Sequence, residues 1–151
     1  MKEDNIEHPT SNFERRSTEY EDRSTESPRI EERVFDLEQR LLDYAAAIIR
    51  VVEQPPKTRA GNHVAAQLLR SGTSPLPNHG EAEAAKSSAD FIPKLRICLK
   101  EFRESRRWLL LIDRVPLVDT PAAVDSLLKE TTELIRIFVA SIRTSLSKSS
   151  K

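Results

Sequence analysis

The chain has 151 residues, of which 38% are hydrophobic and 32% are charged, and its formal net charge is zero. That length suggests one domain with a modest core and a charged surface, while three glycines and 5% aromatic residues favour a helical bundle over a turn-rich β-sandwich. A single cysteine excludes an intrachain disulfide, and the sequence holds no run of about 18 apolar residues that would span a membrane.

Residues 1–30 mix charged residues, serine, threonine and proline with isolated apolar residues. They carry five basic and eight acidic side chains, so the segment has a charge of −3 and the other 121 residues have +3. Such a segment buries too little apolar surface to offset the entropy lost on ordering, which predicts a disordered acidic tail. We expect the tail to screen the more basic remainder. Its polar start does not resemble a secretory signal, and we expect a cytoplasmic protein.

The first helix is predicted over about 34–53, because apolar residues recur every three or four positions between Leu37 and Val52. The adjacent prolines Pro55 and Pro56 end it, since proline lacks an N–H donor and disfavours helix in the residue before it.

The second helix is predicted from Thr58 to about Arg70, again from the spacing of its apolar residues. Gly72, Pro75 and Pro77 follow within a few residues. Together they predict a break or sharp kink, after which helical composition returns briefly.

The third helix is predicted to run to about Ile112 with Asp90 as its N-cap, which would place Pro93 in the first turn, where a missing donor costs little. Apolar residues repeat every three or four positions along it, and Ser105 fills the single polar slot. Cys98 lies on the same stripe and is interpreted as a small core residue rather than a reactive thiol.

The fourth helix is predicted over Pro121 to Leu146, with Asp119 or Thr120 as its cap. Two adjoining apolar faces run along it, which is a wider arc than one core requires. Surplus apolar surface of this kind predicts self-association.

The predicted fold is therefore all-α, an antiparallel up-and-down four-helix bundle formed by residues 31–147. The disordered tail at 1–30 precedes it, and a frayed C-terminus at 148–151 follows it.

Residues 67–112 resemble the four-helix bundle family first found encoded in intervening sequences of bacterial 23S ribosomal RNA genes, and the likeness extends more weakly over about 34–146. The residues that carry the likeness are Asn78, Glu81, Ala82, Ser87, Asp90, Phe91, Leu95, Glu101, Glu104 and Trp108. Two prolines in "SPLPN", and Pro93, depart from the family pattern.

The resemblance implies a left-turning antiparallel bundle that assembles as a ring, a homopentamer, with no established general molecular role. A related branch, the accessory proteins of diversity-generating retroelements, forms a basic pentamer that binds reverse transcriptase and nucleic acid. This chain, with equal numbers of acidic and basic residues, is less basic than that branch.

Basic residues gather on the third helix, and two interpretations of them stay open. The candidate nucleic-acid contacts are Lys94, Arg96, Lys100, Arg103 and Arg107. In the functional interpretation they contact phosphates, repeated around a ring of subunits. In the structural interpretation, which we favour, they form a solvated face paired with Glu101, Glu104 and other acidic neighbours. Trp108 could stack on a base, although at helical spacing it is more often a core or interface residue.

No spacing in the sequence indicates a catalytic or metal site. Glu81, Glu83 and Asp90 could be joined only by His63 and His79 within the bundle, and the paired Glu-x-x-His pattern of a di-iron site is missing. A phosphate-binding glycine loop, a catalytic triad pattern and a CxxC motif are also missing from the sequence. We predict no enzyme, no metal and no cofactor.

The predicted function is a self-assembling helical scaffold or interaction protein. The alternative is an accessory protein that binds RNA or DNA through the basic face of the third helix. The predicted partners are further copies of the chain and either nucleic acid or another protein, with no membrane involved.

Overall fold

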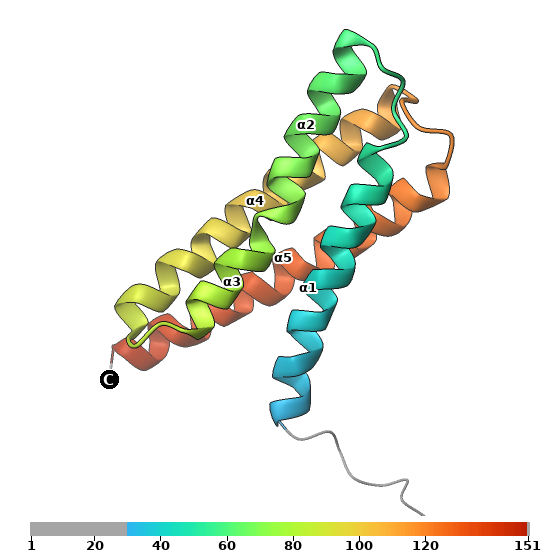
Figure 1. The fold of residues 1–151 in the computed structure, drawn as a ribbon. Coiled ribbons are helices and arrows are strands. Elements are labelled where there is room, and N and C mark those ends of the chain that lie inside the picture. Colours follow the sequence, from blue (N-terminus) through green and yellow to red (C-terminus); the bar gives the residue numbers. More distant parts are fainter. Residues whose placement is uncertain (1–29, 151) are drawn as a thin grey trace, which may run out of the picture.

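The computed structural model describes residues 30–150, and their side chains from residue 37 onwards (Figure 1). The predicted tail therefore lies outside the described residues, except for its last member. Within 30–150 the chain is helical without strands, which confirms the all-α prediction. The helices are α1 Ile30–Val52, α2 Arg59–Thr73, α3 Pro75–Glu83, α4 Ser88–Arg114 and α5 Pro121–Ser149.

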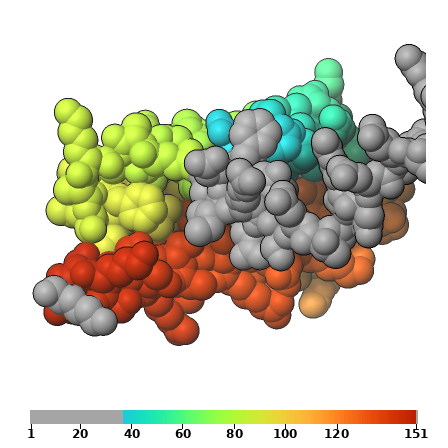
Figure 2. Space-filling view, turned by 90° about the horizontal axis from the view of Figure 1, so that it is seen from below, coloured from blue at the N-terminus to red at the C-terminus, as the bar shows by residue number. Residues whose placement is uncertain are grey.

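These helices form four antiparallel rods, because α2 and α3 follow one another along a single rod (Figure 1). In the space-filling view from below, the early part of α4 lies between α3 and the C-terminal part of α5 (Figure 2). The rod of α2 and α3 packs against α1 and α4, α5 packs against α4, and α1 meets α5 more sparsely. The predicted up-and-down four-helix bundle is confirmed. No helix within residues 30–150 is both long enough and apolar enough to cross a bilayer.

The break predicted after the second helix is only one residue wide. Ser74 keeps a right-handed helical conformation between α2 and α3, with φ −59° and ψ −36°. Pro75 takes the first position of α3, where a missing N–H costs little. Asn78 donates from Nδ2 to the Ser74 carbonyl at 2.9 Å and to its Oγ at 3.2 Å. The Asn78 side chain, at one of the positions that carry the family resemblance, stabilises the junction between α2 and α3. Most of the segment that was predicted to interrupt the helix is therefore helical.

The start of α4 corrects the predicted N-cap. Ser87 is the cap, and its Oγ accepts a hydrogen bond from the Asp90 amide at 3.2 Å. The same Oγ lies 2.7 Å from Asp90 Oδ2, so the serine and the aspartate stabilise the first turn together. Pro93 therefore lies inside the helix. The carbonyl group that would have accepted the missing hydrogen bond belongs to Ala89, which is an exposed residue.

The other helix ends agree with the sequence more closely. Thr120, one of the two predicted caps, occupies the N-cap position of α5 but makes no side-chain capping hydrogen bond, and Pro121 takes the first position as predicted. Thr120 Oγ1 donates to Gln54 Oε1 at 2.6 Å, which ties the start of α5 to the end of α1. The helix continues to Ser149, beyond the predicted end at Leu146.

The core contains the stripe predicted on the third helix. Leu95, Cys98, Phe102, Leu109 and Ile112 are each at most 2% exposed. Edge-to-face aromatic contacts run across the bundle from Tyr44 to Phe102, then to Phe138 and to His79, with centroid separations of 5.5, 5.2 and 5.9 Å. One position differs, because Ile92 is buried while the expected Phe91 is only half-buried.

A layer of hydroxyl groups crosses the middle of this core, with one member from each rod. Tyr44 of α1 shares a hydrogen bond of 2.8 Å with Thr131 of α5, and Thr131 Oγ1 donates to the Leu127 carbonyl at 2.6 Å. Ser105 of α4 donates to Ser71 Oγ of α2 at 2.9 Å. Ser105, the polar slot in the predicted stripe, is thus paired rather than buried alone, as buried polar groups generally are.

Candidate functional site

Four of the five predicted nucleic-acid contacts share the outward face of α4. Arg96, Lys100, Arg103 and Arg107 are exposed and spaced by three or four residues, so they form one row along the helix. We call these four residues the α4 basic row. Among residues 37–150, none of the four forms an ion pair.

Lys94 does not belong to this row. It lies on the side of α4 that faces α3, and its Nζ forms an ion pair with Glu81. Glu81, which carries part of the family resemblance, therefore joins α3 to α4. Sequence spacing could not reveal this pairing, because the helix that contains Glu81 was not predicted to begin at Pro75.

Two acidic residues of α4, Glu101 and Glu104, turn away from the basic row toward α2. Arg70 of α2 donates from Nη1 to Glu101 Oε2 at 3.2 Å and from Nη2 to Glu104. The Glu101 side chain is only 8% exposed, so this arginine compensates a nearly buried carboxylate. The hydrogen bond from Arg70 is the main cause that lowers the pKa of Glu104, and the charge of Lys100 adds a smaller effect. The pairing of Glu101 and Glu104 with the row, which we favoured from sequence, is wrong.

Sequence reasoning missed Arg70, although a signal for it exists. It lies at the end of the predicted second helix, and Glu101 and Glu104 lie three residues apart on the third. Two carboxylates on one helical face require a cation from a neighbouring helix when the face is buried. The sequence did not reveal which neighbour supplies it.

Trp108 is part of the same contact between α2 and α4. Its Nε1 donates to Glu104 Oε1 at 3.3 Å, and its ring meets His63 edge-to-face at a centroid distance of 5.9 Å. The side chain is half-buried. The interpretation of Trp108 as a packing residue is therefore favoured over a base-stacking role.

The residues considered for a metal site are divided among other contacts. His79 is buried, with Nδ1 3.8 Å from Glu83 Oε2. Glu81 pairs with Lys94 and Asp90 with Ser87, as described above. Within the described part of the chain, no cluster of three or more His, Cys, Asp or Glu residues is arranged to hold a metal ion.

Cys98 is fully buried and its Sγ lies 3.6 Å from the Pro75 carbonyl oxygen. Burial raises the pKa of its thiol to about 12, so the sulfur is protonated at neutral pH. It behaves as the small core residue that its place on the stripe predicted.

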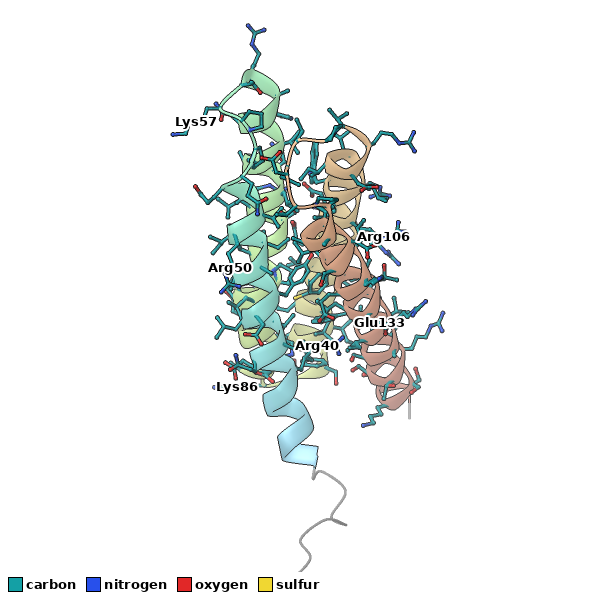
Figure 3. The ribbon with its side chains drawn as sticks, turned by 90° about the vertical axis from the view of Figure 1, so that its right-hand side faces the viewer. Arg40, Arg50, Lys57, Lys86, Arg106 and Glu133 are labelled. Atoms are coloured by element: carbon teal, nitrogen blue, oxygen red, sulfur yellow. The ribbon has the colours of Figure 1, made fainter. Side chains whose placement is uncertain are left out.

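A groove of about 820 Å³ lies between α1 and α5. Ala47 and Ala123 form part of its walls, and Arg40 bridges it by donating to both carboxylate oxygens of Glu130, at 2.5 and 3.0 Å. Figure 3 shows Arg40 and Arg50 on the α1 side of this seam, with Glu133 on α5. The groove contains none of the residues that carry the family resemblance.

Large aliphatic side chains remain on the surface after the core is formed. Their exposure ranges from 38% to 49%, and they are Leu42, Ile49, Leu69, Ile97, Leu110, Leu111, Val115 and Leu146. Leu42 and Ile49 lie seven residues apart and share one face of α1. Leu69 lies on α2, which packs against α1 where Gly72, three residues later, contacts Ile48.

Comparison with known proteins agrees with this architecture. The family model described as 23S rRNA-intervening sequence protein matches residues 34–140. A crystal structure from Bacteroides thetaiotaomicron, described as a protein with unknown function from the S23 ribosomal protein family, is 34% identical in sequence. The match has a TM-score of 0.64 and covers 70% of this chain and 97% of that one. No curated protein matches the chain.

Neither description names an enzymatic activity. The resemblance first recognised over residues 67–112 is thus confirmed over most of the bundle. The chain belongs to the family of 23S rRNA-intervening sequence proteins.

Proposed function

We propose that this protein is a non-enzymatic helical bundle that assembles with copies of itself and serves as an interaction scaffold. The observation that supports this function is the set of large aliphatic side chains left between 38% and 49% exposed. Leu42 and Ile49 share one face of α1, Leu69 lies on the neighbouring α2, and exposed apolar surface on a small protein commonly marks a protein interface. The family resemblance suggests a ring of five subunits.

Light scattering coupled to size-exclusion chromatography tests the assembly. The full chain is expected to elute with a mass several times the 17.2 kDa of one subunit. Replacing Leu42 and Ile49 by glutamate should lower that mass, because each subunit would place charges in an apolar contact. Leu146→Glu, a similarly exposed position on α5, is the matched control.

Each outcome of this experiment is informative. A monomer in the unmodified protein would overturn the proposal. Dissociation caused by Leu146→Glu but not by the α1 variants would keep self-assembly and move the interface to α5.

One observation favours a second function, the binding of nucleic acid through the α4 basic row. The four cations point outward without ion pairs among residues 37–150, while Glu101 and Glu104 of the same helix are paired with Arg70. Unpaired cations in one row attract phosphates and release counterions when they bind them. Fluorescence anisotropy with labelled RNA and DNA tests this function. Reversing the charges of Arg103 and Arg107 should abolish the signal, and unchanged binding would exclude this surface.

A further inference from the structure

We infer that the partner of the α4 basic row is a nucleic-acid duplex, held by its phosphate backbone without reading of the bases. This inference rests on the proposed nucleic-acid function and goes further by naming the form of the partner. Four features support it: the sorting of charge on α4, the geometry of the row, the positions of the aromatic residues and the packing of α4 between its neighbours.

The sorting of charge makes the outward face of α4 purely cationic along the row. Glu101 and Glu104 lie between row members in sequence, yet both turn toward α2 and bind Arg70. Glu104 is held ionised by that contact, because the arginine lowers its pKa. The row itself therefore presents four exposed cations and contains no carboxylate.

The geometry of the row suits a regular, rigid polyanion. From Arg96 to Arg107 the helix rises by about 16 Å, with neighbouring cations roughly 6 Å apart. Duplex DNA carries about one negative charge for each 1.7 Å of its axis, so a rod of this length faces several phosphates at once. Three of the four cations are arginines, whose planar guanidinium groups bind phosphate through two hydrogen bonds.

The aromatic residues argue against a single-stranded partner. Proteins that bind single strands without sequence preference stack bases on exposed aromatic rings. Tyr44, Phe102 and Phe138 are buried, and Phe91 is half-buried. Trp108, which directly follows Arg107 in the sequence, is held by Glu104 and His63. No Phe, Tyr or Trp side chain among residues 37–150 is exposed to offer a stacking surface.

The position of α4 also excludes deep entry into a groove. α2 and α3 pack along one side of α4 and α5 along the other, so only its outward face is free to meet a ligand. A recognition helix that reads bases must enter the major groove. Held between its neighbours, α4 instead lies across the phosphate ridges, where contacts carry no sequence information.

The experiment compares full-length protein binding to labelled probes of about 20 base pairs, longer than the row, with both component single strands. Duplex RNA and duplex DNA are separate arms, because both offer the same phosphate chemistry. Affinity is measured between about 50 and 200 mM salt, where counterion release dominates. We expect duplexes to bind at least about tenfold more tightly than single strands, independently of sequence, with a slope near −0.9 for each cation engaged.

The paired variants are Arg103→Gln with Arg107→Gln, and Arg50→Gln as the matched control. Arg50 is an exposed arginine on α1, a helix that packs mainly against α2, α3 and α5 (Figure 3). Losing two of four cations should halve the salt slope and weaken binding about 30-fold at 0.15 M salt. Because both positions are exposed, circular dichroism should show that the fold is kept.

The outcomes distinguish this inference from the proposed nucleic-acid function on which it rests. Single strands that bind as tightly as duplexes would overturn the inference and leave the nucleic-acid function standing. Absence of binding to every probe would overturn both. Binding that survives the double variant would place the contact elsewhere on the molecule. Displacement of the duplex by poly-glutamate at equal charge would assign the row to an acidic protein partner instead.

Discussion

The seams that the α2–α3 rod makes with its neighbours differ sharply from the seam between α1 and α5. At Gly72, an added Cβ would lie 2.7 Å from Ile48 Cγ2, so the two helices leave no room for a side chain. Between α1 and α5, Ala47 and Ala123 instead line a groove of about 820 Å³. The first seam is closed by packing, and the second is bridged mainly by polar side chains.

The residues that carry the family resemblance are unevenly distributed between these seams. Asn78 supports the kink of the closed rod, Glu81 joins α3 to α4, and Glu101, Glu104 and Trp108 line the contact with α2. The open seam contains none of them. These residues therefore lie in the contacts of the α2–α3 rod with α4, although the family model also spans α1 and most of α5.

The largest expected effect comes from adding volume to the closed seam. Gly72→Leu should lower the free energy of unfolding by about 3 kcal/mol, because the new side chain collides with Ile48. Ala47→Leu, the matched change in the open groove, should alter it by less than about 1 kcal/mol. Urea denaturation followed by circular dichroism measures both. Equal costs at the two sites would show that the seams do not differ in packing.

Removing the arginine of the closed seam should have the next largest effect. Arg70→Ala leaves the nearly buried Glu101 carboxylate without its cation and should cost about 2 kcal/mol. Arg136→Ala breaks an exposed pair on α5 and should cost less than about 0.5 kcal/mol. The same denaturation experiment compares them, and a similar loss for both would mean that burial of Glu101 carries no penalty.

Alkaline pH should weaken the bundle through its buried acids. Burial raises the pKa of Tyr44 to about 12 from 10.0 and that of Cys98 to about 12 from 9.0. Between these values the unfolded chain has lost protons that the folded chain keeps, so stability falls as pH rises from about 9 to 12. The loss from Tyr44 alone should be on the order of 2 kcal/mol at the upper end.

Tyr44→Phe provides the control for that pH dependence. The variant loses the hydrogen bond to Thr131, so it should be slightly less stable at neutral pH. Its stability should then fall less steeply above pH 10, because one titrating group is gone. An unchanged pH slope would assign the alkaline loss to other groups.

The smallest expected effect is at the bridge of the open seam. Arg40→Gln removes the ion pair with Glu130, whose two side chains are 35% and 31% exposed. Partly exposed pairs contribute little, so the cost should stay below about 1 kcal/mol and shrink as salt is added. A loss as large as that of Arg70→Ala would mean that the open seam depends on its polar bridge.

Sequence periodicity predicted the rods because each buries one apolar stripe, and the stripe from Leu95 to Ile112 is buried as expected. Local capping was harder to predict. Ser87 and Asp90 are both good caps, and the helix begins after Ser87 although this places Pro93 inside it.

The sequence predicted which basic residues lie together in the candidate site, but it did not predict how side chains of the neighbouring helices pair around them. Helical spacing placed Arg96, Lys100, Arg103 and Arg107 together correctly. It could not show that α2 supplies a competing cation, Arg70, to the carboxylates nearby. Pairings between helices depend on how the rods are rotated, and the periodicity of one helix carries no such information.

The hydroxyl layer across the core has a consequence for the register of the four rods. Apolar side chains would tolerate a rod that slides by one turn, about 5.4 Å, since one leucine replaces another. The Tyr44–Thr131 and Ser71–Ser105 pairs would not, because such a slip would bury each hydroxyl opposite hydrocarbon at roughly 1–3 kcal/mol apiece. The layer therefore selects one longitudinal register of the four rods among several that the apolar core alone would accept.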